Sequence, residues 1–143
     1  MITINSAVYG RMNVEDNQLY HFPQGIVGFS AISRYALVPF ENTDFFVLHA
    51  TEEDVSFILV PAAKAKREYA FEIDEDTVRM LDIEHPEEVA AFFIVNIVGD
   101  IPYINPKAPV LIVPRSQKGC QYVLTQSAYP IREPLRMEGA SSC

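Results

Sequence analysis

FFVLHATEEDVSFILV, residues 45–60, contains two runs of apolar, β-branched and aromatic residues on either side of an acidic turn. Runs of this kind, bounded by short polar segments, are typical of paired β-strands. The pattern predicts one strand from Phe45 to Ala50, a second from Ser56 to Val60, and a hairpin turn at residues 52–54. Similar short runs on both sides of this hairpin extend the same interpretation to the rest of the chain.

Most of the remaining chain has the same pattern. At the start, Ile2, Ile4 and Val8 have polar residues between them, which indicates a half-buried strand. The run from Val89 to Val98 has the composition of a central strand buried on both faces. The other expected strands are Leu19–Phe22, Tyr35–Phe40, Tyr69–Ile73, Val110–Val113 and Gln121–Thr125.

Two short helices are expected between these strands. Pro61 begins a helical turn that continues to Arg67. Asp74 is the expected N-cap of a second helix, which should end before Pro86. About eight or nine strands with one or two short helices predict a mainly β fold, a compact antiparallel β-sandwich or a partly open barrel-like single domain. This domain is expected to span residues 1–135, with a flexible C-terminal tail at 136–143.

FPQGIVGF, residues 22–29, is expected to be an ordered turn and neither a strand nor a helix. Gly25 and Gly28 are predicted to supply positive φ angles, and Pro23 and Phe29 belong to the same structural turn. The flanking phenylalanines can pin the turn to the core. A contact between these phenylalanines and a partner protein is the alternative function for the block.

The charge is concentrated in one third of the chain. The 143 residues carry a net charge of −8, and residues 52–88, with 12 acidic and 4 basic residues, account for −8. This balance argues against a nucleic-acid backbone or an anionic membrane as the direct partner. It is compatible with either a solvated acidic face or a docking face for a basic protein.

The cysteines and the ends of the chain point to a reducing compartment. Cys120 lies in an apolar segment and Cys143 is the last residue, so the sequence predicts no disulfide framework. The opening MITINSAV lacks the basic start and apolar region of a signal peptide. No apolar run is long enough to span a bilayer. The expected location is the cytoplasm.

No catalytic motif is apparent in the sequence. It lacks a phosphate-binding loop, a nucleophile elbow and a calcium loop with glycine at its sixth position. His21, His49 and His85 have no metal-ligand spacing to one another or to a cysteine. The sequence therefore predicts a binding protein without cofactor or metal. A site assembled from distant residues stays open, and it would require a deep polar pocket.

Four blocks of the sequence, in this order and at these spacings, resemble the bacterial flagellar assembly factor family FliW. The resemblance covers Ile2 to Leu135. The blocks are FPQGIVGF (22–29), SFILVP (56–61), YAFEI (69–73) with EHPEEV (84–89), and the stretch from Asn105 through Ala108 and Pro109 to YPIREPL (129–135). The chain departs from the family pattern at Ala70, where a glutamate is usual, and at Pro114, where an asparagine is expected.

The resemblance implies a compact β fold and a regulatory binding function. Proteins of this family bind the RNA-binding translational repressor CsrA and relieve its repression of flagellin mRNA, and they also bind flagellin. The alternative within the same family is a flagellin chaperone without CsrA regulation, which requires a groove for an amphipathic helix.

The site expected from the resemblance comprises partner-binding and structural residues. The expected partner-binding residues are Tyr69, Phe71, Glu72, Asp74, Asn105 and Lys107, and Ala108 and Pro109 are expected in the adjoining structural turn. A purely structural interpretation is equally open, because Asn105 can satisfy backbone groups in a turn and Phe71 can belong to the core.

Overall fold

The structure, a computed structural model that describes residues 1–136, contains eleven β-strands and four short helical segments. The strands are β1 (Ile2–Ser6), β2 (Gly10–Val14), β3 (Leu19–His21), β4 (Arg34–Pro39), β5 (Phe46–Ala50), β6 (Ser56–Pro61), β7 (Ala90–Val98), β8 (Ile101–Ile104), β9 (Val110–Val113), β10 (Lys118–Gln121) and β11 (Glu133–Pro134). The helical segments are η1 (Asp16–Gln18), α1 (Ala62–Ala65), α2 (Glu75–Met80) and η2 (Pro86–Glu88).

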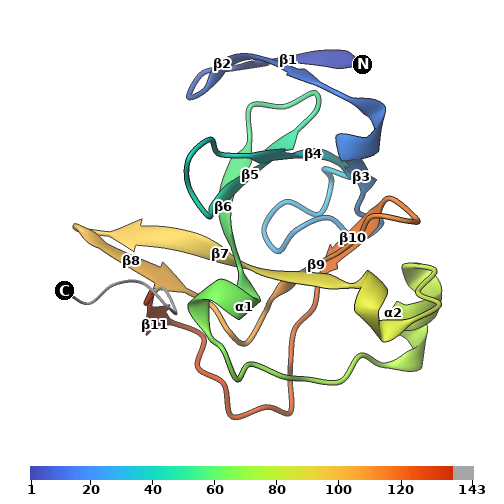
Figure 1. The fold of residues 1–143 in the computed structure, drawn as a ribbon, viewed down its shortest axis with the longest axis vertical. Helices are drawn as coiled ribbons and strands as arrows, with labels where there is room; N and C mark the ends of the chain where they lie inside the picture. Colours follow the sequence, from blue (N-terminus) through green and yellow to red (C-terminus); the bar gives the residue numbers. More distant parts are fainter. Residues whose placement is uncertain (137–143) are drawn as a thin grey trace.

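Nine of the strands form one sheet that bends until it closes. Their order is β11-β8-β7-β6-β5-β4-β3-β10-β9, and an additional pairing between β7 and β9 joins seven of them into a barrel (Figure 1). β8 and β11 extend outward from the barrel, whereas β1 and β2 form a separate hairpin. The predicted mainly β, barrel-like fold is confirmed. One pairing departs from the antiparallel expectation, because β10 runs parallel to β3 where Lys118 is opposite His21.

β7 closes the barrel because it has different partners along its length. Residues 92–95 pair with β6 on one edge. On the other edge, residues 90–92 pair with β9 and residues 95–98 pair with β8. The last three residues, 96–98, extend beyond the barrel with β8 and are exposed. The prediction that Val89–Val98 is buried on both faces is therefore wrong at this end.

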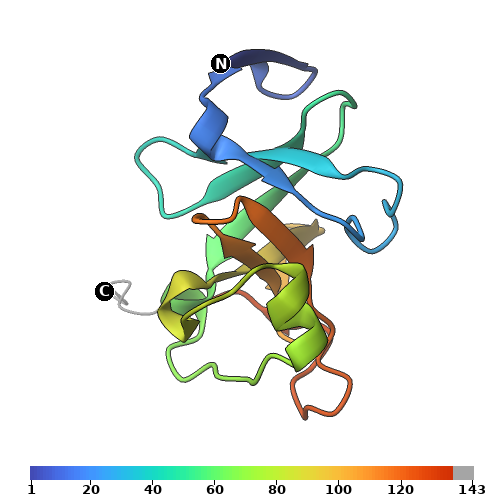
Figure 2. The same ribbon diagram turned by 90° about the vertical axis from the view of Figure 1, so that its right-hand side faces the viewer.

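The β1–β2 hairpin lies against the outside of the barrel (Figure 2). Ile4 and Val14, one from each strand, are buried against Ala36 of β4. The predicted half-buried strand is thus present at Ile2 and Ile4, but it ends at Ser6, and Val8 is exposed in the turn that follows. β2 was not predicted, because its Arg11 and Asn13 face outward and leave little apolar pattern.

Both predicted helices are present, and both are shorter than expected, since α1 ends at Ala65 and not at Arg67, and α2 ends at Met80. The Asp74 carboxylate accepts a hydrogen bond of 2.8 Å from the Thr77 amide, so Asp74 is the N-cap of α2. The helix ends well before Pro86 because Asp82 adopts a left-handed conformation, with φ of 54°. The amides of Asp82 and Ile83 then donate to the carbonyls of Arg79 and Val78. These two bonds form a Schellman motif, which an aspartate builds here in place of the usual glycine.

The turn at residues 22–29 closes one side of the main core. Phe22 and Ile26 are buried with Tyr35, whose ring lies edge-on to that of Phe22 at 5.1 Å. Gly25 has φ of +65°, and a Cβ atom there would lie 2.6 Å from the carbonyl oxygen of Phe29. Only glycine therefore fits this position without a backbone shift.

Two of the predicted strands differ from the structure. In place of the expected strand Gln121–Thr125, β10 runs from Lys118 to Gln121, because the turn after β9 takes only residues 114–117, and residues 122–125 belong to no strand. Residues 69–73 form no strand at all. β8 and β11 were not predicted, since both are short and contain proline.

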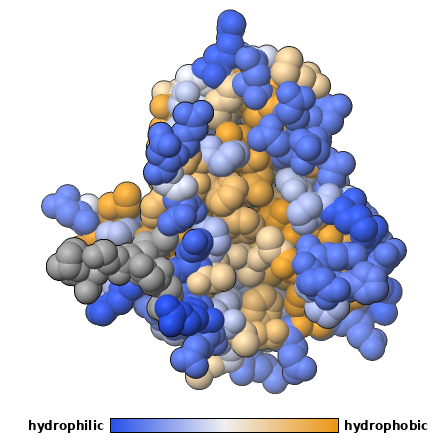
Figure 3. All heavy atoms as spheres, in the orientation of Figure 1, coloured by the Kyte–Doolittle hydropathy of each residue, from blue (hydrophilic) through white to orange (hydrophobic). Residues whose placement is uncertain are grey.

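The face of the molecule shown in Figure 3 has a central apolar band with polar residues on either side. Apolar residues run down the centre of this face, and hydrophilic residues surround them (Figure 3). Within residues 1–136, none of the helices has the length and apolar character that a membrane crossing requires. The predicted tail comprises residues 136–143. Of these, residues 137–143 lie outside the part of the chain that the structure describes.

Candidate functional site

The candidate site is centred on residues 69–74, which run extended from α1 to α2 along the bottom of the molecule (Figure 1). Along this segment, half-buried and exposed residues alternate strictly. The rings of Tyr69 and Phe71 face inward, where the Tyr69 ring lies 4.7 Å from that of Phe93. Glu72 and Asp74 face the solvent. Segment 69–74 thus has the side-chain pattern of a β-strand without belonging to the sheet.

Tyrosine hydroxyls hold this segment in place of a neighbouring strand. The hydroxyl of Tyr129 accepts a hydrogen bond from the Ala70 amide at 3.1 Å and donates one to the Ala70 carbonyl at 2.9 Å. Tyr122 accepts a hydrogen bond from the Asp74 amide at 2.9 Å. The Tyr69 hydroxyl donates to the carbonyl of Pro106 at 2.5 Å. Three tyrosines therefore anchor one short extended segment.

The protonation states of these groups suit their contacts. Burial raises the pKa of Tyr69, with a smaller contribution from Tyr129, so its hydroxyl keeps the proton that it donates. Burial also raises the pKa of Tyr122. The hydrogen bonds from Thr77 hold the pKa of Asp74 below its usual value, so this N-cap stays ionised.

Residues 105–109 form the turn that receives the Tyr69 hydroxyl. The Asn105 side-chain oxygen accepts a hydrogen bond from the Lys107 amide at 3.1 Å, and the Asn105 carbonyl accepts one from the Ala108 amide. The ammonium group of Lys107 donates to the carbonyl of Ser127 at 3.1 Å. Ala108 and Pro109 are buried. Asn105 therefore has the turn-forming role that the sequence left open, and Lys107 braces the neighbouring loop.

Segment 69–74 separates two hollows. The first is a groove of about 570 Å³ between this segment and the chain that leads from α2 into β7, with a mostly apolar lining. The second, of about 580 Å³, lies between the segment and the loop at residues 122–129. Residues that line the first groove are Tyr69, Ala70, Phe71, Glu72, Ile73, Val78, Ile83, Glu84, His85, Pro86, Val89 and Ala91. The groove thus brings three of the expected residues, Tyr69, Phe71 and Glu72, together with a far wall that was not predicted from the sequence.

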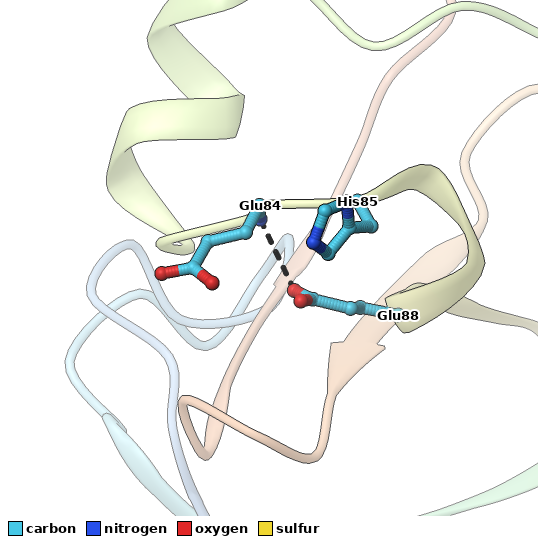
Figure 4. Close-up of side chains that lie close together, drawn as sticks. All are labelled: Glu84, His85 and Glu88. Atoms are coloured by element: carbon cyan, nitrogen blue, oxygen red, sulfur yellow. Dashed lines mark hydrogen bonds between the residues drawn. The ribbon is translucent and has the colours of Figure 1, made fainter.

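Three ligand-type side chains converge at the rim of this groove. Side-chain atoms of Glu84, His85 and Glu88 lie within 4.8 Å of one another (Figure 4). Glu88 accepts hydrogen bonds of 3.1 Å from the Glu84 amide and from Nε of Arg115. These contacts lower the pKa of Glu88, the amide first and the guanidinium next. Because the single guanidinium of Arg115 pairs with both Glu84 and Glu88, the cluster is an ion-pair network that braces the rim.

The other two histidines lie in strands, as expected from the sequence. His21 is in β3 and His49 in β5. His49 is fully buried, and its Nδ1 lies 2.7 Å from the carbonyl oxygen of Ala50, so this nitrogen carries the proton. Its Nε2 lies 3.5 Å from the carboxylate of Asp54 and forms no hydrogen bond within the described residues, whereas that carboxylate accepts a hydrogen bond from the Ala7 amide. This arrangement ties the β5–β6 turn to the β1–β2 hairpin and lies apart from the groove.

Three residues of the site, Tyr122, Ile83 and Val89, were not predicted from the sequence. Tyr122 and Val89 lay inside predicted strands, where they gave no separate signal. Tyr129 belongs to a recognised block, but nothing in its neighbourhood indicates that its hydroxyl contacts Ala70. These contacts join segments far apart in the chain, so local patterns cannot predict them.

Several known proteins that this chain resembles share one name, and each of these matches covers nearly the whole chain. A family profile described as FliW protein matches residues 3–135. A protein named flagellar assembly factor FliW from Caldicellulosiruptor saccharolyticus is 32% identical over 132 residues, which cover 90% of this chain and 87% of the relative. A protein of the same name from Clostridium kluyveri is 33% identical, covering 98% of this chain and 99% of the relative. A crystal structure of the flagellar assembly factor FliW superposes with a TM-score of 0.85 at 25% identity, covering 93% of this chain and 96% of that one.

Proposed function

The chain belongs to the FliW family of flagellar assembly factors, and from this premise we propose that it is a cytoplasmic protein-binding regulator that antagonises CsrA and binds flagellin. Flagellin retained in the cell would occupy the protein and leave CsrA free to repress flagellin synthesis. Export of flagellin would release the protein to remove CsrA from the message. Synthesis would in this way follow export.

The observation that supports this proposal is an apolar groove bordered by acidic residues within the most acidic part of the chain. Glu72 and Glu84 both line the groove, and both lie within residues 52–88, which carry a net charge of −8. A protein that binds RNA must present a basic surface. Complementary charge speeds the encounter of such a protein with an acidic face and disfavours other partners.

We assign the partner contact to segment 69–74, which borders the groove, and to the neighbouring turn at residues 105–109, which receives the Tyr69 hydroxyl. The proposed residues are Tyr69, Phe71, Glu72, Asp74, Asn105 and Lys107. Their roles differ: Glu72 is exposed and available to a partner, whereas Asn105 and Lys107 shape the turn beside it. Glu72 is therefore the residue on which the proposal depends most directly.

A flagellin chaperone without CsrA regulation is the second candidate. The mostly apolar groove favours it, since an amphipathic helix binds through an apolar face. A ligand-binding enzyme would instead require a deep polar pocket, and the lining of the groove is of the opposite character.

Isothermal titration calorimetry with purified CsrA at two salt concentrations tests the proposal, with flagellin added later as a competitor. We expect a dissociation constant of about 1 μM or lower, about −8 kcal/mol, and weaker binding at the higher salt concentration. The substitution Glu72→Lys should weaken CsrA binding at least about tenfold. Glu52→Lys, in the exposed β5–β6 turn, is the matched control with the same change in charge.

The alternatives give different results. If folded protein and active CsrA release no heat on mixing, CsrA regulation is excluded and flagellin remains the expected partner. If both variants bind CsrA equally well, the contact lies away from Glu72.

A further inference from the structure

The backbone of segment 69–74 is unpaired at its centre. Within residues 1–136, the amide and carbonyl groups of Phe71, Glu72 and Ile73 form no hydrogen bond with the rest of the chain. Their neighbours Ala70 and Asp74 are bound by tyrosine hydroxyls. Three consecutive residues in an extended conformation therefore present free donors and acceptors, as an edge strand of a sheet does.

The geometry of an extended chain gives the direction of these groups. In an extended chain, the backbone groups of successive residues point to opposite edges. Both groups of Ala70 and the amide of Asp74 point toward the 122–129 loop, where Tyr129 and Tyr122 bind them. The groups of Phe71 and Ile73 consequently point to the opposite edge, which borders the 570 Å³ groove.

The groove also limits the chemistry of its occupant. Most residues of its far side, among them Ile83 and Val89, are apolar, so the interior of the groove favours apolar side chains. Glu72 lies on its rim, is exposed and forms no ion pair within the described residues. A strand added at this edge would place alternate side chains on the floor and the others near the acidic rim. Apolar residues alternating with basic residues satisfy both surfaces.

We propose that the protein captures an extended peptide segment with alternating apolar and basic residues by strand addition, pairing it with the backbone of Phe71 and Ile73. This inference rests on the proposed function, because it describes how the same groove holds a protein partner. An amphipathic helix is the competing occupant. A helix satisfies its own backbone groups and would leave the amides of Phe71 and Ile73 unpaired.

The test uses the full chain labelled with ¹⁵N and the acetylated, amidated peptide KVKVKVK as probe. Amide hydrogen exchange is followed by NMR at low salt. At saturating peptide, exchange at Phe71 and Ile73 should slow at least about tenfold, because paired amides exchange only on opening. The amides of Ala70 and Asp74, already bound to tyrosine hydroxyls, should change little.

Two modified peptides distinguish strand addition from simple charge attraction. One carries N-methyl groups on every valine and the other on every lysine, so each has lost the amide donors of one edge. A strand that pairs through a single edge should tolerate one of these peptides, whereas the other should bind at least about tenfold more weakly. Glu72→Lys should weaken binding of the unmodified peptide relative to the Glu52→Lys control.

Three results would overturn the inference: no binding of KVKVKVK, binding without protection at Phe71 and Ile73, or equal binding of both N-methylated peptides. The outcome is separable from that of the proposed function. CsrA binding without protection of these two amides would contradict strand addition alone. Protection by the peptide, with neither CsrA nor flagellin bound, would contradict the proposed function alone.

Discussion

The hydroxyl group of Tyr129 binds both backbone groups of Ala70, accepting from the amide at 3.1 Å and donating to the carbonyl at 2.9 Å. One side chain thereby makes the two hydrogen bonds that a paired strand residue would make. The contact involves only the backbone of residue 70, so it does not require the glutamate that is usual in the family. The departure at Ala70 therefore leaves the anchoring of the segment intact and changes only its exposed surface.

Removal of this hydroxyl should loosen the segment without unfolding the protein. In Tyr129→Phe both hydrogen bonds are lost, and the free energy of unfolding should fall by about 1 kcal/mol, since Ala70 is exposed and water can replace the partner. Urea denaturation measures the loss, and amide exchange at Ala70 should accelerate. Tyr9→Phe is the control, because the Tyr9 hydroxyl forms no hydrogen bond within residues 1–136. Unchanged exchange at Ala70 would show that the hydroxyl does not hold the segment.

The two glycines of the 22–29 turn should differ in their tolerance of alanine. Gly25→Ala combines a positive φ with a Cβ atom 2.6 Å from a carbonyl oxygen, so we expect a loss of about 3 kcal/mol or more. At Gly28, φ is +90° but the space around the Cβ position is open, so the loss should be about 1–2 kcal/mol. Paired urea denaturation curves give the comparison. Equal losses would mean that the clash at Gly25 is relieved by a backbone shift.

Cys120 should be unreactive while the protein is folded. Burial, with a smaller contribution from Asp74, raises the pKa of this thiol from 9.0 to about 12, and the thiol rather than the reactive thiolate persists at pH 8. In a Cys143→Ser variant, which leaves Cys120 as the only thiol, iodoacetamide should react in urea and hardly at all in native buffer. Fast alkylation in native buffer would show that the core around β10 opens readily.

The same pKa shift predicts a dependence of stability on alkaline pH. A thiol whose folded pKa lies above its unfolded pKa stabilises the folded state fully below the unfolded value. This contribution is lost as the pH rises from about 9 towards about 12. Denaturation midpoints measured across this range should therefore fall less steeply in Cys120→Ala than in the parent. Parallel curves for the two proteins would contradict the assignment.

Asp74 should give the opposite dependence at acidic pH. Its folded pKa is lowered by the hydrogen bonds from Thr77, so its contribution to stability is present above the unfolded value and is lost as the pH falls through the folded value. Asp74→Asn keeps a capping side chain and should remove this acid dependence, whereas Asp74→Ala should also lower stability at neutral pH. Thermal denaturation between pH 2 and about 7 separates the two effects. Identical behaviour of both variants at neutral pH would exclude the capping role.

The sequence predicted those parts of the fold that depend on neighbours in the chain. The pattern of residues 45–60 gave β5 and β6 within one residue of their observed bounds, since an apolar run and its turn are local properties. The second helix ends before Pro86 as predicted, but the sequence did not indicate the end at Met80, because Asp82 adopts the left-handed conformation usually supplied by glycine. The alternation at residues 69–73 is real, but the strand prediction failed because tyrosine hydroxyls replace the neighbouring strand. The groove was beyond prediction, because Ile83 and Val89 face segment 69–74 only after the chain has folded.

The parallel pairing of β3 with β10 also bears on the order of folding. β3 is made early in synthesis, and its second edge stays open until residues 118–121 emerge. Closing so long a loop carries a high entropic cost and gives the barrel a high contact order, which slows folding. A nascent chain that has not reached β10 therefore exposes a strand edge to other chains. Limited proteolysis of chains truncated before Lys118 would measure how far this vulnerability extends.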